Sequence, residues 1–582
     1  MCGIAGILST SRPVSHLAVQ RMTDSIIHRG PDGGGVWIDE NGSIGLGHRR
    51  LSIIDLSDAG HQPMHYRGRY TITFNGEIYN YLEIKEKLTS AGYQFKSQSD
   101  TEVILAAYDL YGEGCLNHFD GMFAFAIWDD QEQQLFVARD RFGEKPLFYA
   151  WHEGQFIFAS EIKALWALGL PKKINERMLF NFYYFKSLFN PDDLSETFYG
   201  NIIQLKPAHS MYVSASGKII QQKCYWEIPE NYDPITISDE DAKLQFANLF
   251  KVFIKRRLRS DVPVGSSLSG GLDSSVVVAN INQIKEKSVI QKTFSARFPG
   301  FKKDESAYID LLLKHVLAEG FSCMPNEQSV AFNIDKIIAH QDEPFNSLSI
   351  AAQYEVMQLA RKNGVIVLLD GQGADEYLCG YPGLIDSYLI DLKKHNPKQY
   401  KKELDDFQHA QSENTINSIE RRVRRMRVKQ FLGSKPIDQF LLLQQRISSS
   451  SNAQLINSLV SPGERVFYNR KYLHENLHGM LHYATFKGGL QELLRYADRN
   501  SMAHSLEVRL PFLSHELVEF VFSLPDNFKF REGFTKYILR KGMEDVLPSE
   551  ICWRKDKIGY EVHATQVQGK PLNNYLINSL IQ

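Results

Sequence analysis

A short run rich in glycine and serine, residues 269–275 (SGGLDSS), separates an apolar stretch from an amphipathic one. The apolar stretch 262–268 has the length and composition of a buried strand, and residues 274–284 continue as a helix. A second β-branched run, residues 365–369, also ends in a glycine turn. Strands that alternate with helices in this way indicate a mostly parallel sheet. Residues 238–582 are therefore predicted to form an α/β domain.

Residues 1–205 carry a different pattern. Many short β-rich runs, among them 70–74 and 122–128, are bounded by Gly, Asp or Asn. Apolar side chains recur at helical spacing only in residues 15–27 and 81–91. We predict a first domain built mainly of strands.

A linker is predicted over residues 206–237, because the polar stretch at its end contains Pro229 and Pro234. A long amphipathic helix then follows. Ser238 is its expected N-cap, with Asp241 three residues further on. The polar, helical region 390–460 receives no functional role from its sequence.

The chain has 582 residues, a net charge of −2 and 43% hydrophobic residues. A balanced charge argues against nucleic acid as a partner, and no apolar run approaches the roughly 18 residues of a membrane span. The six cysteines show no CxxC spacing, which favours a reducing compartment over a disulfide framework. No secretory signal pattern is present. We expect a cytoplasmic protein without membrane insertion.

The SGGLDSS loop has the chemistry of a phosphate site. Its glycines let backbone N–H groups approach an anion, and the helix that follows adds positive potential. Ser269, Ser274 and Ser275 supply hydroxyl donors. Asp273 would repel bare phosphate, but it suits a Mg²⁺ ion held between it and phosphate oxygens. An ordinary glycine turn is the alternative, and the aspartate with three serines favours the nucleotide site.

A second acidic glycine turn, residues 370–376 (DGQGADE), follows the strand 365–369. Ligands of open α/β sheets bind at the carboxyl ends of strands. Two such ends suit one nucleotide with metal ions, and Asp375 is the expected second Mg²⁺ ligand.

The chain opens with Met1-Cys2-Gly3. If Met1 is removed, Cys2 carries a thiol and a free α-amine, and this pair can act as nucleophile and base. Such an amine has a pKa of about 7.7–8.0, so it is partly neutral near pH 7.

These features occur together with further ordered motifs. They are CGIAG at 2–6, HRGPD at 28–32, RLSIID at 50–55, NGEIYN at 75–80, SDTE at 99–102, ARDRFG at 138–143, DRNSMA at 498–503 and EVRLPF at 507–512. The set resembles glutamine-dependent asparagine synthetases over essentially the full length. The resemblance implies an αββα Ntn-hydrolase-type sandwich of antiparallel sheets, a class II glutamine amidotransferase, followed by an ATP-pyrophosphatase-type α/β sheet with added helices. It also implies a homodimer and an internal ammonia tunnel.

The resemblance assigns roles in the first domain. Cys2 would attack the side-chain amide of glutamine, and Asn75 with the Gly76 N–H would stabilise the oxyanion. Arg50 and Asp100 would hold the α-carboxylate and the α-amino group. The glutamine-binding residues implied are Arg50, Ile54, Asn75, Gly76, Glu77 and Asp100.

In the second domain a carboxylate acceptor would attack ATP to give an acyl-adenylate, from which ammonia displaces AMP. Asp273 and Asp375 would hold Mg²⁺. A lysine should stabilise the transition state, and Lys557 is favoured over Lys555. The ATP-binding residues implied are Leu268, Ser269, Gly270, Gly271, Asp273, Ser274, Ala296, Asp370 and Gly371.

The chain departs from the family pattern at Gln372, where a glutamate is expected to meet the acyl-adenylate and accept a proton. An amide cannot serve as that base. Glu343, Glu376 or a phosphate oxygen would have to replace it. The acceptor therefore stays open between aspartate, which would give asparagine, and a larger carboxylate, such as a uronic acid or a peptide of bacterial surface-polysaccharide or secondary metabolism.

Two other functions were weighed. A non-catalytic relative used as a binding module would be favoured by loss of Cys2 or Asp273, and both are present. A cyclising synthetase of the β-lactam-forming kind needs no ammonia, and relatives of that kind typically lack the working cysteine. Intact Cys2, Arg50, Asn75 and Asp100 favour an ammonia-producing enzyme.

Overall fold

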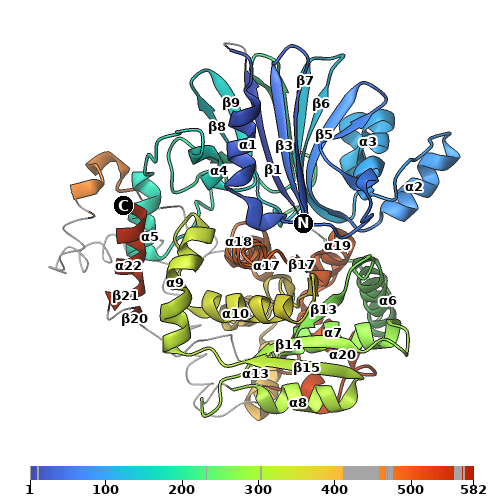
Figure 1. Ribbon diagram of the computed structural model, residues 1–582. Coiled ribbons are helices and arrows are strands. Elements are labelled where there is room, and N and C mark those ends of the chain that lie inside the picture. Colours follow the sequence, from blue (N-terminus) through green and yellow to red (C-terminus); the bar gives the residue numbers. More distant parts are fainter. Residues whose placement is uncertain are drawn as a thin grey trace.

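The computed structural model describes residues 2–9, 12–230, 233–301, 304–410, 456, 458–466, 468, 476–555, 566–567 and 570–581. An N-terminal domain of sheets lies above a C-terminal α/β domain in Figure 1. The chain's N-terminus is at the boundary between them. None of the helices in the described ranges is long and apolar enough to cross a membrane.

The N-terminal domain contains two six-stranded antiparallel sheets. The first has the order β10 (Ile203–Gln204), β8 (Phe148–His152), β9 (Gln155–Ala159), β1 (Gly3–Ser9), β3 (Ile44–Arg50) and β2 (Gly33–Ile38). The second has the order β12 (Ile219–Cys224), β11 (His209–Ser214), β7 (Gln134–Arg139), β6 (Gly121–Asp129), β5 (Tyr70–Ile78) and β4 (Met64–Tyr66). Apolar side chains of both sheets, such as Ile4 and Trp128, share one buried cluster between them.

Helices cover the outer faces of this sandwich. They are α1 (His16–Asp24), α4 (Ile162–Trp166) and α5 (Glu176–Phe185) on the first sheet, and α2 (Tyr81–Ser90) and α3 (Asp100–Tyr111) on the second. The layers are helix, sheet, sheet, helix, which confirms the predicted αββα fold. Helices α1 and α2 match the predicted runs, whereas α3 was missed because its apolar residues are not confined to one face.

The expected linker 206–237 needs correction. Strands β11 and β12 lie within it, and β11 pairs antiparallel with β7. The first domain therefore extends to Cys224, beyond the expected boundary at residue 205. Buried and partly exposed residues alternate over only a few positions of β11, so its sequence does not distinguish a strand from connecting chain.

The C-terminal domain contains a parallel five-stranded sheet, which confirms the predicted α/β class. Its order is β15 (Ala318–Cys323), β14 (Gln291–Ala296), β13 (Val264–Ser267), β16 (Val367–Leu369) and β17 (Glu507–Arg509). Helix α6 (Asp239–Arg257) precedes the sheet, and the side chain of Ser238 accepts the N–H of Asp241 as predicted. The outermost strand β17 faces the N-terminal domain, where Arg509 lies 3.6 Å from Glu77.

The remaining described helices follow α6 along the chain. They are α7 (Leu272–Ile284), α8 (Ser306–His315), α9 (Glu327–Gln341), α10 (Ser349–Lys362), α11 (Ala374–Tyr377), α12 (Pro382–His395), α13 (Pro397–Ala410), α17 (Leu477–Phe486), α18 (Gly489–Met502), α19 (His515–Ser523), α20 (Tyr537–Met543), α21 (Ser549–Cys552) and α22 (Leu572–Ile581). The two domains meet over a buried ion network. Arg29 pairs with Glu161 at 2.7 Å and with Asp498 of α18 at 2.8 Å.

Candidate active sites

The first candidate site lies at the start of β1. Cys2 is buried there, and its backbone N–H donates to Oδ1 of Asn75 on β5 at 3.0 Å. Because β1 and β5 belong to different sheets, the sandwich brings these two residues together. A cavity of about 30 Å³ opens beside Cys2. Its lining includes six residues predicted for glutamine, namely Cys2, Arg50, Ile54, Gly76, Glu77 and Asp100.

Asn75 and Gly76 have the features that an oxyanion-binding pair requires. Nδ2 of Asn75 is buried and has no hydrogen-bond partner in the part of the chain that the structure describes. Gly76 has φ +154°, and a Cβ there would lie 2.1 Å from the carbonyl oxygen of Met122. A fixed, buried donor beside a thiol can stabilise negative charge that develops on a substrate oxygen.

Charged groups of opposite sign line this cavity. The guanidinium of Arg50 donates to the carbonyl of Ser57 at 2.9 Å and to the carbonyl of Asp55. Asp100, at the start of α3, accepts the N–H of Ile78 at 2.9 Å. Burial raises the pKa of Asp100 to about 6. A cation and carboxylates around one small cavity suit the two charged ends of an amino acid.

Glu77 is the second carboxylate of this cavity. Burial raises the pKa of Glu77 well above its usual value, and the nearby carboxylates Glu507 and Asp100 raise it further. Arg509 acts in the opposite direction. Glu507 and Arg509 come from β17 of the other domain, and sequence reasoning gave them no role. The only signal was the quoted motif EVRLPF.

The thiol itself is protonated at rest. Burial raises the pKa of Cys2, although the N–H of Leu51 and the charge of Arg50 lower it. A base is therefore needed to take the thiol proton during attack.

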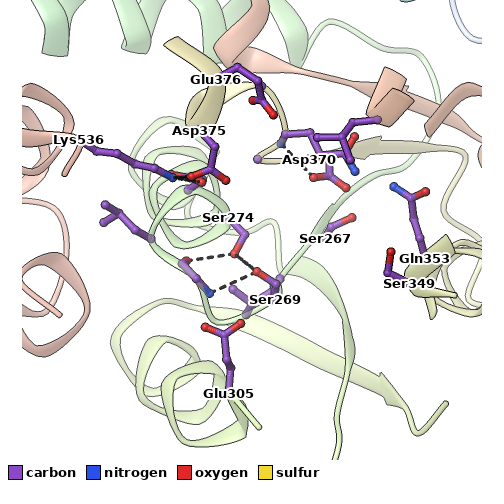
Figure 2. Close-up of a pocket in the computed structure, with 18 of the residues that line it drawn as sticks. Ser267, Ser269, Ser274, Glu305, Ser349, Gln353, Asp370, Asp375, Glu376 and Lys536 are labelled. Carbon is purple, nitrogen blue, oxygen red and sulfur yellow. Dashed lines mark hydrogen bonds and ion pairs between the residues drawn. The ribbon is translucent and has the colours of Figure 1, made fainter. Parts of the chain in front are cut away.

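A second, larger cavity of about 350 Å³ lies at the carboxyl ends of β13 and β16 (Figure 2). The loops that follow these strands touch, since a Cβ at Gly371 would lie 2.7 Å from the backbone nitrogen of Ser274. The predicted residues that line it are Leu268, Ser269, Gly271, Asp273, Ser274, Asp370, Gly371, Gln372 and Asp375.

Two predicted ATP contacts lie outside this lining. Gly270 is a loop residue with φ +87°. It packs against Glu305, since a Cβ at Gly270 would lie 2.9 Å from that residue. Ala296 ends β14, whereas Phe294 of the same strand lines the cavity.

The loop before α7 has the geometry of an anion site. Oγ of Ser269 lies 3.0 Å from Oγ of Ser274 and accepts the N–H of Gly271 at 3.2 Å. The first turn of α7 points its N–H groups toward this loop, since α7 begins at Leu272. Hydroxyl and backbone donors therefore converge where phosphates would bind.

Lys536 is the main residue that sequence reasoning missed. It is buried, and its Nζ lies 2.5 Å from Oδ2 of Asp273 and 2.6 Å from Oδ1 of Asp375. Burial acts to lower the pKa of Lys536, but the two carboxylates outweigh it and the pKa is raised. The ammonium group is therefore charged beside the phosphate loop.

The residues fit the expected Mg²⁺. Asp273 and Asp375 approach closely enough to share one ammonium group. Magnesium in nucleotide sites is held by one or two carboxylates together with phosphate oxygens and water. Within the described ranges no group of three or more His, Cys, Asp or Glu side chains could hold a metal by itself. Asp273 and Asp375 would therefore hold the ion only together with a bound nucleotide.

In the described part of the segment expected to supply a lysine, an arginine lines the cavity. Nη1 of Arg554 donates to the carbonyl of Gly270 at 2.8 Å and pairs with Glu305 at 2.7 Å. Arg554 lines the cavity, whereas Lys555 does not. Lys557 lies outside the described residues.

Gln372 lines the cavity, and its Oε1 is buried without a hydrogen-bond partner among the described residues. Of the two carboxylates considered as its replacement, Glu376 lines the same cavity and accepts the hydroxyl of Tyr381 at 2.7 Å. Glu343 does not line it. It pairs with Arg495 at 3.3 Å and accepts the N–H of Phe198 at 2.9 Å.

The wall formed by α10 and α18 is neutral. It presents Ser349, Gln353 and Tyr496 to the cavity. Figure 2 shows Ser349 and Gln353 on one side of the view and Lys536 on the other. All lysine and arginine side chains in the described lining come from residues 536–554.

Comparison with known proteins matches a family model to each domain. A family model for a glutamine amidotransferase domain matches residues 1–226, and a model for asparagine synthase matches residues 245–581. Asparagine synthetase (glutamine-hydrolyzing) 1 of Bacillus subtilis is 31% identical over 597 residues, which cover 100% of this chain and 88% of that protein. The chain belongs to the asparagine synthetase family. It is therefore a glutamine-hydrolysing carbon–nitrogen ligase that uses ATP.

Other relatives of this chain differ in their named activities. A putative asparagine synthetase (glutamine-hydrolyzing) 2 of Methanocaldococcus jannaschii is 38% identical over 68% of this chain and 79% of its own length. Amidase chry2 of Gibberella zeae is 27% identical over 95% of this chain and 87% of its own length. A solved glutamine phosphoribosylpyrophosphate amidotransferase of B. subtilis aligns with a TM-score of 0.30 and 16% identity, covering 56% of this chain and 82% of that one. An alignment with so low a TM-score supports no conclusion about this chain.

Proposed function

We propose that the chain releases ammonia from glutamine at Cys2 and adds it to a carboxylate that ATP has activated in the larger cavity. The observation that carries this proposal is the pairing of Cys2 with Asn75, beside a cavity that offers charges for both ends of an amino acid. In the second domain, the phosphate loop 269–275 and Lys536 would carry out the half-reaction that activates the carboxylate with ATP.

In the first half-reaction Sγ of Cys2 attacks the side-chain carbonyl of glutamine. The thiol proton passes to the α-amine of Cys2 once Met1 has been removed, and then to the leaving nitrogen. Nδ2 of Asn75 and the N–H of Gly76 stabilise the oxyanion. Ammonia leaves, a thioester forms, and water hydrolyses the thioester to glutamate.

In the second half-reaction an acceptor carboxylate oxygen attacks the α-phosphorus of ATP, and pyrophosphate leaves. The loop 269–274 binds the phosphates, and Lys536 neutralises charge on the leaving pyrophosphate. Mg²⁺ held by Asp273 and Asp375 would supply further charge neutralisation. Ammonia then attacks the acyl carbon, AMP leaves, and one proton is lost from the new amide nitrogen.

The acceptor proposed first is aspartate, with asparagine as product, because relatives that match this chain are named asparagine synthetases. A second candidate is a larger carboxylate, such as a uronic acid or a peptide. The neutral wall of Ser349, Gln353 and Tyr496 favours it, since the described part of that wall has no cation for an α-carboxylate. Gln372 favours it as well, because it leaves that position without a carboxylate.

Pyrophosphate release tests the proposal. The full chain is incubated with glutamine, ATP and Mg²⁺ and a panel of carboxylates that includes aspartate, nucleotide-linked uronates and short acidic peptides. The proposal requires one panel member to release pyrophosphate and AMP in equal amounts and to appear as its amide. Glutamine hydrolysis without AMP formation across the whole panel would contradict the acceptor proposals but not the role of Cys2.

We also infer a cytoplasmic location and a homodimer. All six cysteines are free thiols, which supports a reducing compartment. The homodimer rests on the family resemblance, and sedimentation velocity of the purified chain tests it.

A further inference from the structure

Arg509 is a residue of one domain whose charged group lies beside a residue that lines the cavity of the other. It ends β17, where it pairs with Leu369 of β16 in the C-terminal sheet. Its side chain is fully buried. Nη2 of Arg509 lies 3.6 Å from Oε1 of Glu77, which lines the glutamine cavity.

The guanidinium of Arg509 is held in one orientation by the rest of its contacts. Nε pairs with Glu507 at 2.6 Å. Nη1 donates to the carbonyls of Arg257 at 2.8 Å and Arg259 at 2.6 Å. Nη2 is the nitrogen left without a hydrogen-bond partner among the described residues, and it is the one that faces Glu77. A planar group fixed at three points presents its remaining edge with little freedom.

Glu77 needs a neighbouring cation. It is buried near two other carboxylates, Asp100 and Glu507, and both disfavour its charged form. One oxygen of Glu77 faces Arg509, and the other, Oε2, is buried without a hydrogen-bond partner in the described structure. A carboxyl group with one oxygen facing a cation and the other vacant is arranged to accept a donor from the cavity side.

We propose that Arg509 is a positioning residue for glutamine hydrolysis, which orients the Glu77 carboxylate toward the α-ammonium group of glutamine. This inference rests on the glutamine cavity proposed above. It means that the glutamine site is incomplete without the C-terminal domain, because its carboxylate is oriented by a strand of the synthetase sheet.

The test is steady-state glutamine hydrolysis by the full chain, which needs no acceptor. We expect Arg509→Met to raise KM for glutamine about tenfold, the value of one charge-assisted hydrogen bond, with kcat changed less than about twofold. Arg509→Lys keeps the charge and should recover part of the loss. Arg256→Met is the matched control, since Arg256 crosses the same domain interface to Asp120 at 3.0 Å, but none of its ion-pair partners lines the glutamine cavity.

Two further measurements separate positioning from a general effect on folding. Glutaramate, which is glutamine without its α-amino group, should be hydrolysed equally by the parent and by Arg509→Met. In a Glu77→Gln background, Arg509→Met should add no further increase in KM, because the partner is gone. The inference would be overturned if Arg509→Met reduced hydrolysis of glutamine and of glutaramate equally. It would also be overturned if the increases in KM from Glu77→Gln and Arg509→Met multiplied in the double variant.

Removal of Arg509 takes away one of the cations that stabilise the buried Glu507 carboxylate, so that variant is at risk of misfolding. The double variant Arg509→Met/Glu507→Gln removes both charges and should show the same raised KM for glutamine. If Cys2→Ala hydrolyses glutamine as fast as the parent, the glutamine cavity itself is wrongly assigned. If Cys2 is required and KM stays unchanged in every Arg509 variant, only the role of Arg509 fails.

Discussion

The ammonium group of Lys536 lies 2.5 Å from Oδ2 of Asp273. It also lies 2.6 Å from Oδ1 of Asp375, so one cation joins the loops that follow two neighbouring strands. Two partly buried carboxylates this close repel each other, and Lys536 offsets that repulsion. The same position places a positive charge beside the loop expected to hold pyrophosphate.

Lys536→Met should therefore impair the activating half-reaction alone. We expect acceptor-dependent pyrophosphate release to fall about 100-fold, which is typical for loss of one charged group at a transition state. Glutamine hydrolysis should change less than about twofold, because Lys536 does not line the glutamine cavity. Both rates are measured on the same preparation.

Lys541→Met is the control for this change. Lys541 lies on helix α20, whose N-cap residue is Lys536, but it pairs with Glu544 at 3.3 Å and is 38% exposed. It should leave both rates at the parent level. A Lys536 variant that keeps full pyrophosphate release would rule out the proposed role.

Cys2→Ala should abolish glutamine-driven amide formation and leave ammonia-driven formation intact. The thiol is the only nucleophile at the smaller cavity with an adjacent oxyanion donor in the described structure, whereas ammonia added from solution bypasses that cavity. The assay compares product from glutamine with product from ammonium chloride. Cys224→Ala, at an exposed thiol, is the control and should change neither. Glutamine-driven product that survives Cys2→Ala would remove the glutaminase assignment.

Glutamine hydrolysis should lose efficiency in mild acid. Burial raises the pKa of Asp100 to about 6, and only the ionised carboxylate binds an ammonium group. Below pH 6 the kcat/KM for glutamine should therefore fall, by about tenfold per pH unit well below the pKa.

The variant Asp100→Asn tests the direction of this pH dependence. Asp100 raises the pKa of Glu77, so its replacement by a neutral amide should lower the pKa of Glu77. The acid limb of the kcat/KM profile should then move to lower pH, although its plateau is reduced. An acid limb that stays in place or moves to higher pH would mean that neither carboxylate controls binding.

Local sequence patterns predicted what depends on local chemistry. The helix α6 cap at Ser238, the strand–loop–helix at 264–284 and the glycine requirement of the phosphate loop all follow from a few adjacent residues. The position of Cys2 beside Asn75 needed more than local patterns, because two sheets must pack to join residues 73 apart. The ordered family motifs supplied that information.

The site residues that sequence patterns do not predict lie where segments distant in the chain meet. Lys536 follows the second strand of a small hairpin and carries no motif, and only the folded chain brings it to Asp273, 263 residues away. Arg509 lies within a motif, but its target Glu77 is on the other domain. Arg554 was likewise assigned no role from its sequence, although its side chain lies in the cavity wall. Lys557, the lysine favoured in that segment, lies outside the described residues and stays a prediction.

Gln372→Glu should change the choice of acceptor. Oε1 of Gln372 is buried in the cavity without a partner among the described residues, and a carboxylate there could accept the proton that the attacking ammonia loses. We expect amide formation with aspartate to rise several-fold, measured as asparagine per AMP released with ammonium chloride as the nitrogen source. Ser349→Ala serves as the control, because it alters the same cavity without adding a base. If the Gln372 variant and the parent form asparagine at equal rates, this position does not decide the acceptor, and the neutral wall of α10 and α18 becomes the next place to change.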